Sequence, residues 1–193
     1  MFTQHQYPQF FTSTCLEWKY LLANDNYKKI IIEDLKWLVN HHWIKIYCFV
    51  IMPNHLHYIW HVHPSLIYQK VKGSHLRNTA QKIKNDLIVN NEQKILDQFY
   101  VGAKDRAYQF WERNPLSTDL YSPHVIQQKM NYIHANPIRK NLCQAAEDYI
   151  YSSAEYYKSG QDQFGILTHI GEIGTWNEDP ILVKSKYFGS DAS

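Results

Sequence analysis

The chain has 193 residues and a formal net charge of +2, and 45% of its residues are apolar, which suffices for one domain with a real core. No apolar run approaches the roughly 20 residues of a membrane span, and the N-terminus lacks the basic and apolar regions of a signal peptide. Three widely spaced cysteines (Cys15, Cys48 and Cys143) indicate reduced thiols rather than a disulfide framework, so we expect a cytoplasmic protein with no membrane contact.

The first predicted elements are a strand and a helix. Residues 8–18 are β-prone with partial alternation and predict a first strand. Residues 24–26 (Asn-Asp-Asn) offer helix N-cap chemistry. Apolar residues then recur at the spacing of one helical face, at Tyr27, Ile31, Leu35 and Leu38. We expect this helix to end near residues 41–42.

A hairpin is predicted next. Residues 44–52 are a continuous apolar run of strand length, and residues 55–62 form a second run. Pro53-Asn54 between them is a turn signal. Because the gap is so short, the two strands should pair as an antiparallel hairpin.

The middle of the chain is basic and helical in tendency. Residues 65–98 predict a helix broken at Gly73. Its apolar stripe consists of Leu76, Ala80, Ile83 and Leu87. Residues 107–111 predict a short fourth strand.

A last helix should begin at Ser122-Pro123, where proline takes the permitted first position, and should be disturbed or ended at Asn136-Pro137. The resulting order predicts an α+β fold with an antiparallel sheet in βαββαβ, ferredoxin-like (RRM-like palm) order and helices on one face. We expect residues 1–160 to form the domain. Residues 161–193 are acidic and contain four of the seven glycines, and we expect them to be a loosely docked tail.

Charge is distributed unevenly along the chain. Residues 65–140 carry twelve Lys/Arg against six Asp/Glu, whereas residues 141–193 carry three against eight. A surplus of six positive charges in the middle is what a surface facing a polyanion would require, although solvated helix faces would give the same count.

Two histidines open the second strand of the hairpin. Side chains at i and i+2 of a strand share a face, so His55 and His57 should lie together while Leu56 points into the core. Paired imidazoles are half of a metal site, but exposed strand histidines also occur without a function. His61 and His63 illustrate the second interpretation, and we expect them on the sheet surface.

The last predicted helix carries a second pair. Tyr132 and Asn136 are separated by four residues, so a helix stacks them on one face. A half-buried tyrosine followed by a C-terminal cap would have the same spacing. The histidine pair and this pair gain meaning only if the fold brings them together.

The two motifs, MPNHLH and YIHANPIRKNL, resemble those of the single-tyrosine HUH transposases, an insertion-sequence transposase superfamily named for its His-hydrophobic-His motif. The resemblance is to the branch of REP-associated tyrosine transposases and spans roughly residues 8–157. Residues 110–113 (FWER) and 151–154 (YSSA) also resemble that branch.

The resemblance implies roles for four residues. His55 and His57 match the metal-binding histidines, Tyr132 matches the nucleophile, and Asn136 matches the third, polar ligand. It also implies a sheet that carries the histidines, with the tyrosine helix laid against it. His134 has no counterpart and should point away from the Tyr132 face.

The implied activity is DNA transposition through single-strand cleavage and rejoining. Two imidazoles and an amide oxygen suit Mg²⁺ or Mn²⁺, and the tyrosine would form a 5′-phosphotyrosine link. The implied substrate is single-stranded DNA with a hairpin, bound by a homodimer or a monomer. Candidate DNA-binding residues are Lys70, Lys72, Arg77, Lys82, Lys84, Arg113, Arg139 and Lys140.

Two other interpretations stay open. A domesticated nucleic-acid-binding module would keep this fold without turnover, but it would have no need for all four site residues. A zinc-stabilised domain would need another soft ligand, and Cys48 is the nearby thiol, although its β-prone surroundings favour burial in the core.

Overall fold

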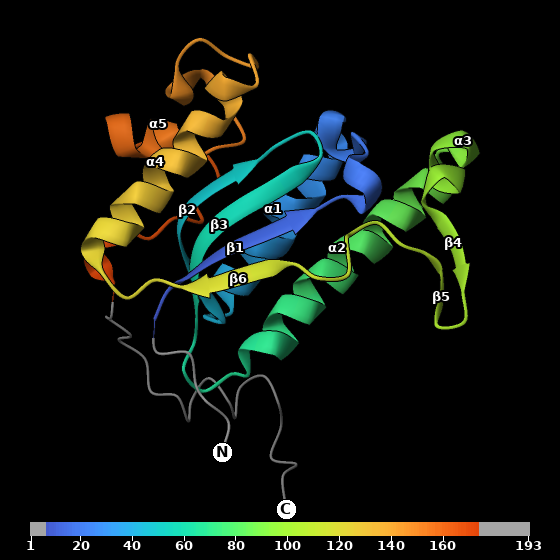
Figure 1. The fold of residues 1–193 in the computed structure, drawn as a ribbon, viewed down its shortest axis with the longest axis horizontal. Coiled ribbons are helices and arrows are strands. Elements are labelled where there is room, and N and C mark those ends of the chain that lie inside the picture. The colour runs from blue at the N-terminus through green and yellow to red at the C-terminus, as the bar shows by residue number, and fades with distance from the viewer. Residues whose placement is uncertain (1–6, 174–193) are drawn as a thin grey trace, which may run out of the picture.

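The computed structural model describes residues 7–173, and its centre is a four-stranded antiparallel sheet (Figure 1). The strands are β1 (Gln9–Thr14), β2 (Ile44–Ile51), β3 (His55–Val62) and β6 (Leu116–Asp119), in the order β2-β3-β1-β6. Along the chain, the strands of this sheet and the two helices between them follow the order β1, α1, β2, β3, α2, β6. The predicted hairpin is confirmed, because β2 and β3 pair directly. Strand β3 is therefore central, between β2 and β1.

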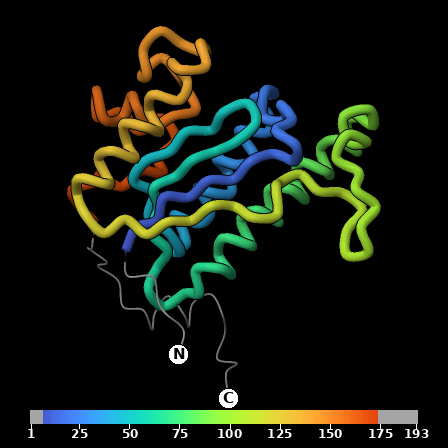
Figure 2. The backbone as a smooth tube through the Cα atoms, viewed as in Figure 1, coloured from blue at the N-terminus to red at the C-terminus, as the bar shows by residue number. Residues whose placement is uncertain are grey.

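The fourth strand differs from the prediction at residues 107–111. Residues of that segment form β5 (Arg106–Tyr108), which pairs with β4 (Tyr100–Ala103) in a separate hairpin. The fourth strand of the main sheet is β6, which pairs with β1 at one edge of the sheet. Strand β4 is the nearest segment with which residues 106–108 can pair. The loop between β4 and β5 is short, so closing it costs little entropy. The hairpin lies at the end of the molecule opposite α4 and α5 (Figure 2).

Two long helices cover one face of the sheet. Helix α1 (Asp25–Asn40) begins at the N-cap Asn24, whose side chain accepts a hydrogen bond from Asn26 N at 2.9 Å. Helix α2 (Tyr68–Val89) packs beside α1, and the short α3 (Gln93–Leu96) follows it. The apolar sides of α1 and α2 form one hydrophobic cluster with Leu56. Among residues 7–173, no helix is both long enough and apolar enough to span a bilayer.

Helices also cover the opposite face, which corrects the expectation of helices on one face only. Helix α4 (Pro123–Arg139) lies over β2 and β3, and α5 (Ala154–Ser159) follows it (Figure 1). A second hydrophobic cluster on this face includes Val50, Ile59 and Ile133. All residues of β3 and all but Lys45 of β2 are buried, so both faces of these two strands are shielded from water.

Gly73 does not break α2, which is continuous from Tyr68 to Val89. A single glycine in a helix interior destabilises the helix by about 1 kcal/mol relative to alanine. The packing of the apolar face of α2 outweighs this cost. Pro137 likewise does not end α4, which continues to Arg139. Because the proline lies in the last turn, its missing N–H removes only one terminal hydrogen bond.

The first strand ends earlier than predicted, at Thr14, because the chain turns sharply at residues 16–18. Short 3₁₀ segments of this kind connect the main elements at Leu16–Trp18, Leu21–Ala23, Asp97–Phe99, Ala146–Asp148 and Ile170–Glu172.

The predicted tail is docked where the structure describes it. Thr168 N donates to Ile46 O (2.8 Å), so the chain runs along the outer edge of β2. Ile166 is buried in the core. The expectation of loose docking is therefore wrong for residues 161–173, and residues 174–193 lie outside the described range.

Candidate functional site

His55 and His57 lie on one face of β3, and their ring centroids are 4.8 Å apart. In the antiparallel register, Thr14 is the partner of His55 and Thr12 the partner of His57. The Thr12 hydroxyl contacts His57 Nδ1 at 2.7 Å, and Asn54 Oδ1 contacts His55 Nδ1 at 2.7 Å. Because an amide oxygen only accepts, His55 Nδ1 must donate, which leaves the lone pair of neutral His55 on Nε2.

Both imidazoles are buried beneath α4, with exposed fractions of 6% for His55 and 4% for His57. Burial lowers the pKa of His55 to about 4, with a smaller contribution from Lys140, while a side-chain hydrogen bond with Asn136 opposes the shift. Burial lowers the pKa of His57 to about 3, and the charges of His55 and Lys129 add to the effect. Both rings are thus neutral near pH 7, as a metal ligand must be.

Helix α4 brings Tyr132 and Asn136 over this pair. The Tyr132 ring lies 5.3 Å from the His57 ring and 6.1 Å from the Phe10 ring, in edge-on geometry. Asn136 is buried, and its Nδ2 donates to the Tyr132 carbonyl oxygen at 2.8 Å. That hydrogen bond uses one N–H of the amide, and the Asn136 side chain is also hydrogen-bonded to His55. Tyr132 is 39% exposed, so its phenol is reachable from solvent.

Cations flank the tyrosine. Lys129 Nζ lies 4.6 Å from the Phe10 ring centroid and 5.9 Å from that of Tyr132. Arg139 Cζ lies 5.6 Å from the Tyr132 centroid, and Lys140 lies close enough to influence His55. Arg139 and Lys140 were expected near the site, and the fold brings them there. Lys129 was not expected, although its i−3 spacing from Tyr132 was a usable signal.

His134 points away from the Tyr132 face, as predicted. Its Nε2 contacts Cys48 Sγ at 3.2 Å and Ser153 Oγ at 2.9 Å, between α4 and the start of α5. Burial raises the pKa of Cys48 to about 12, so the thiol is protonated and packed in the second hydrophobic cluster. The Cys48 sulfur, which a zinc-stabilised domain would need as a ligand, contacts His134 and Ser153 between α4 and α5.

His61 and His63 are buried rather than on the sheet surface, because helices cover both faces. His63 Nδ1 contacts Ser65 Oγ at 2.8 Å in the turn before α2. The expectation of surface positions for these two residues is wrong.

A groove with a volume of about 800 Å³ runs between α2 and residues 105–115, and we call it the α2 groove. Five cations line it, namely Lys72, Arg77, Lys84, Arg106 and Arg113. Two acids, Asp105 and Glu112, line it as well, and Asp105 pairs with Arg106 and, at 3.9 Å, with Arg113. Its wall includes the aromatic side chains of Tyr108, Phe110 and Trp111.

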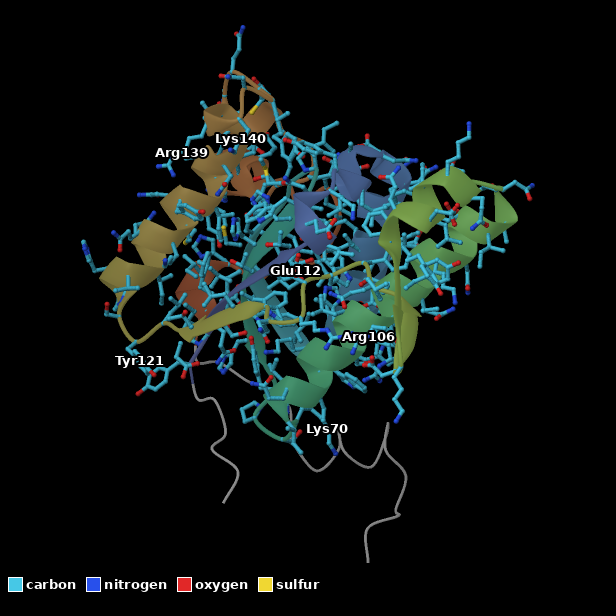
Figure 3. All side chains as sticks on the ribbon, turned by 45° about the vertical axis from the view of Figure 1, so that its right-hand side comes forward. Lys70, Arg106, Glu112, Tyr121, Arg139 and Lys140 are labelled. Atoms are coloured by element: carbon cyan, nitrogen blue, oxygen red, sulfur yellow. The ribbon has the colours of Figure 1, made fainter. Side chains whose placement is uncertain are left out.

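The structure separates the cations predicted on α2 into two groups. Lys72, Arg77 and Lys84 line the groove, whereas Lys82 lies 3.9 Å from Asp34 of α1. Lys70 lies near the first turn of α2, away from the groove lining (Figure 3). Arg106 also lines the groove and was not among the predicted DNA-binding residues.

The donor set fits a hard divalent ion better than a closed zinc site. His57 Nε2 is buried and has no hydrogen-bond partner among residues 7–173. The amide oxygen of Asn136 is a hard ligand that Mg²⁺ and Mn²⁺ accept. Within the described part of the chain, no group of three or more His, Cys, Asp or Glu side chains is placed to hold a metal. An ion at this site would therefore keep positions open for water or a phosphate.

No family model matches the sequence, and no curated protein matches it. Among solved structures, the fold is similar to one described as a REP-associated tyrosine transposase bound to a REP hairpin. The TM-score is 0.59 at 15% sequence identity, and the match covers 93% of this chain and 96% of that chain. The two proteins therefore share a fold, and this is the architecture that the resemblance of the two sequence motifs implied.

Proposed function

We propose that this protein is a DNA transposase that cleaves and rejoins single-stranded DNA through Tyr132. The observation that carries the proposal is the convergence of His55, His57 and Asn136 beneath a solvent-accessible tyrosine. These side chains come from a strand and a helix that are about 75 residues apart in sequence. The shared fold with a hairpin-bound tyrosine transposase supports the same assignment.

His55, His57 and Asn136 would hold the divalent ion, Mg²⁺ or Mn²⁺. When bound there, the ion would polarise a phosphate oxygen and offset the negative charge that develops during attack. Thr12 and Asn54 contact the Nδ1 atoms of the two rings, so the Nε2 atoms are the ones that would bind the ion. The burial of both rings keeps them neutral and excludes water from one side of the site.

Tyr132 is the nucleophile in this proposal. Its phenolic oxygen attacks the phosphorus, a new P–O bond to tyrosine forms, and the bond to the 3′-oxygen breaks. The phenol loses its proton and the departing strand gains one as a free 3′-hydroxyl. Since the phosphodiester energy is kept in the 5′-phosphotyrosine, another 3′-hydroxyl can reverse the step and join strands without ATP.

The DNA would be bound by two groups of cations. Lys129, Arg139 and Lys140 surround the tyrosine, and they are positioned to contact the phosphates next to the cleaved bond. The cations of the α2 groove would contact phosphates farther along the strand, and the aromatic wall of the groove offers apolar surface to bases.

The test is formation of the covalent adduct. Hairpin-bearing single strands with randomised flanks and a 3′-label are incubated with the protein and Mn²⁺, and adducts are separated on a denaturing gel. The wild type should form an adduct whose peptide map places the nucleotide on Tyr132. Tyr132→Phe should form none and should still bind the same strands.

Tyr121→Phe is the matched control. Tyr121 is an exposed tyrosine that directly precedes Ser122, the N-cap residue of α4. It should form the adduct as the wild type does. An adduct that persists in Tyr132→Phe would refute the assignment of the nucleophile. Strand binding without any adduct in the wild type would favour the domesticated binding module.

A further inference from the structure

The turn after β1 holds two successive non-glycine residues in the left-handed region. Glu17 has φ of 53° and Trp18 has φ of 59°. L-amino acids with a Cβ disfavour this region, and two in a row are rarely kept without compensation. Such strain is typical of functional sites, where surrounding contacts stabilise a conformation that the sequence alone would avoid.

Contacts from two other segments hold this turn in place. Glu112 Oε1 accepts a hydrogen bond from Glu17 N at 2.7 Å. Asn54 Nδ2 donates to Trp18 O at 3.3 Å, and Cys15 N donates to Asn54 O at 2.8 Å. Asn54 is also the residue whose Oδ1 contacts His55 Nδ1. One asparagine therefore ties the Trp18 backbone to the ring of a proposed metal ligand.

The Trp18 side chain is exposed to solvent. It is 58% exposed, and its ring lies edge-on to His55 with centroids 5.7 Å apart. More than half of the Trp18 surface is therefore accessible to a ligand, next to His55, one of the proposed metal ligands.

Trp18 also lies between the two groups of cations. Its turn is bonded to Glu112, which lines the α2 groove, and to Asn54, which contacts His55. In Figure 3, Glu112 lies between Arg106 of β5 on one side and Arg139 and Lys140 at the end of α4 on the other. A strand that passed from the groove to Tyr132 would cross this turn.

We propose that Trp18 is a stacking platform for one base of the single strand, next to the phosphate that Tyr132 attacks. This inference rests on the proposed function. Stacking would fix the strand between the groove and the site, and because every base has a flat face, it would act whatever the sequence. Trp18 is thus a positioning residue, and it touches neither the phosphate nor the ion.

The experiment compares two strands of equal charge, a dT20 oligonucleotide and a 20-mer of abasic sites. Their affinities are measured by fluorescence anisotropy for the Tyr132→Phe protein, which cannot cleave, with and without Trp18→Ala. Loss of one stacked base should weaken dT20 binding about 5- to 150-fold, equivalent to ~1–3 kcal/mol. Binding of the abasic strand should not change, because it presents no base to stack.

Two further variants guard against trivial results. Trp18→Phe keeps an aromatic face and should recover part of the dT20 affinity. Trp37→Ala removes another exposed tryptophan, one that stacks on His41, the C-cap residue of α1, with centroids 4.0 Å apart, and it should leave both affinities unchanged. Circular dichroism and melting temperatures establish that each variant is folded.

An unchanged dT20 affinity in Trp18→Ala would overturn the inference, and so would equal weakening toward both strands. The adduct assay separates this outcome from failure of the proposed function. If the wild type forms the Tyr132 adduct while Trp18→Ala binds dT20 normally, the function stands and the stacking role is wrong. If no adduct forms, the function fails and the inference falls with it.

Discussion

The hydroxyl of Thr12 lies 2.7 Å from Nδ1 of His57, across the β1–β3 pair that the antiparallel register aligns. The contact orients the ring, and when Nδ1 donates to the hydroxyl, the lone pair of neutral His57 is on Nε2. Nε2 is the buried atom without a hydrogen-bond partner among the described residues. Thr12, which belongs to neither sequence motif, thus orients His57 so that Nε2 can serve as a ligand atom of the proposed metal site.

Replacing Thr12 with valine should weaken metal binding, because the shape is kept and the ring loses its hydrogen bond. Partners of this kind contribute about 10- to 100-fold to metal affinity. Mn²⁺ binding measured by titration calorimetry or electron paramagnetic resonance should show a loss in that range. Thr14→Val is the matched control, because Thr14 is opposite His55 and the ring of His55 bonds to Asn54 instead. Equal losses in both variants would contradict this role of Thr12.

Divalent metal should stabilise the folded protein through His55 and His57. A ligand that binds only the native state at 100 times its dissociation constant adds about 2.7 kcal/mol to the free energy of unfolding. We therefore expect Mn²⁺ to raise the melting temperature of the wild type and to have no effect on His57→Ala. His124→Ala, at an exposed position in the first turn of α4, should respond as the wild type does. A melting temperature that Mn²⁺ leaves unchanged in the wild type would refute the metal site.

The two lysines near the end of α2 should contribute differently to DNA binding. Lys84 lines the groove, whereas Lys82 lies 3.9 Å from Asp34 on the α1 side. For single strands, each phosphate contact adds about −0.7 to the slope of log K against log salt concentration. Lys84→Gln should make the slope shallower by about that amount, and Lys82→Gln should leave it unchanged. The two variants remove the same charge from the same helix, so equal slopes would show that the groove does not bind the strand.

Gly73→Ala should stabilise the protein. Gly73 is inside α2, and a Cβ built on it meets no atom within 4 Å. Alanine in such a place is favoured over glycine by about 0.5–1 kcal/mol in the free energy of unfolding. Gly160→Ala is the contrasting variant, because Gly160 has φ of +81° at the C-cap of α5, and there alanine should destabilise. Urea denaturation of both variants should show a higher free energy of unfolding for Gly73→Ala and a lower one for Gly160→Ala.

The predictions from sequence succeeded where short-range spacing carries the information. His55 and His57 share a face because side chains alternate along a strand, and Tyr132 and Asn136 share one because a helix repeats every 3.6 residues. The turn at Pro53-Asn54 likewise determined the β2–β3 hairpin. The two pairs involve residues within four positions of one another, and the hairpin depends on a short turn, so all three relationships depend mainly on local sequence.

Only the tertiary structure decided which segments meet. The fourth strand is β6 rather than residues 107–111, both faces of the sheet are covered, and Lys82 and Lys84 point to different surfaces. Thr12 and Trp18 join the site only because β1 pairs with β3 and the following turn is held by Glu112. The physical reason is that long-range pairing depends on competition between alternative partners and on loop closure, neither of which a local pattern of residues encodes.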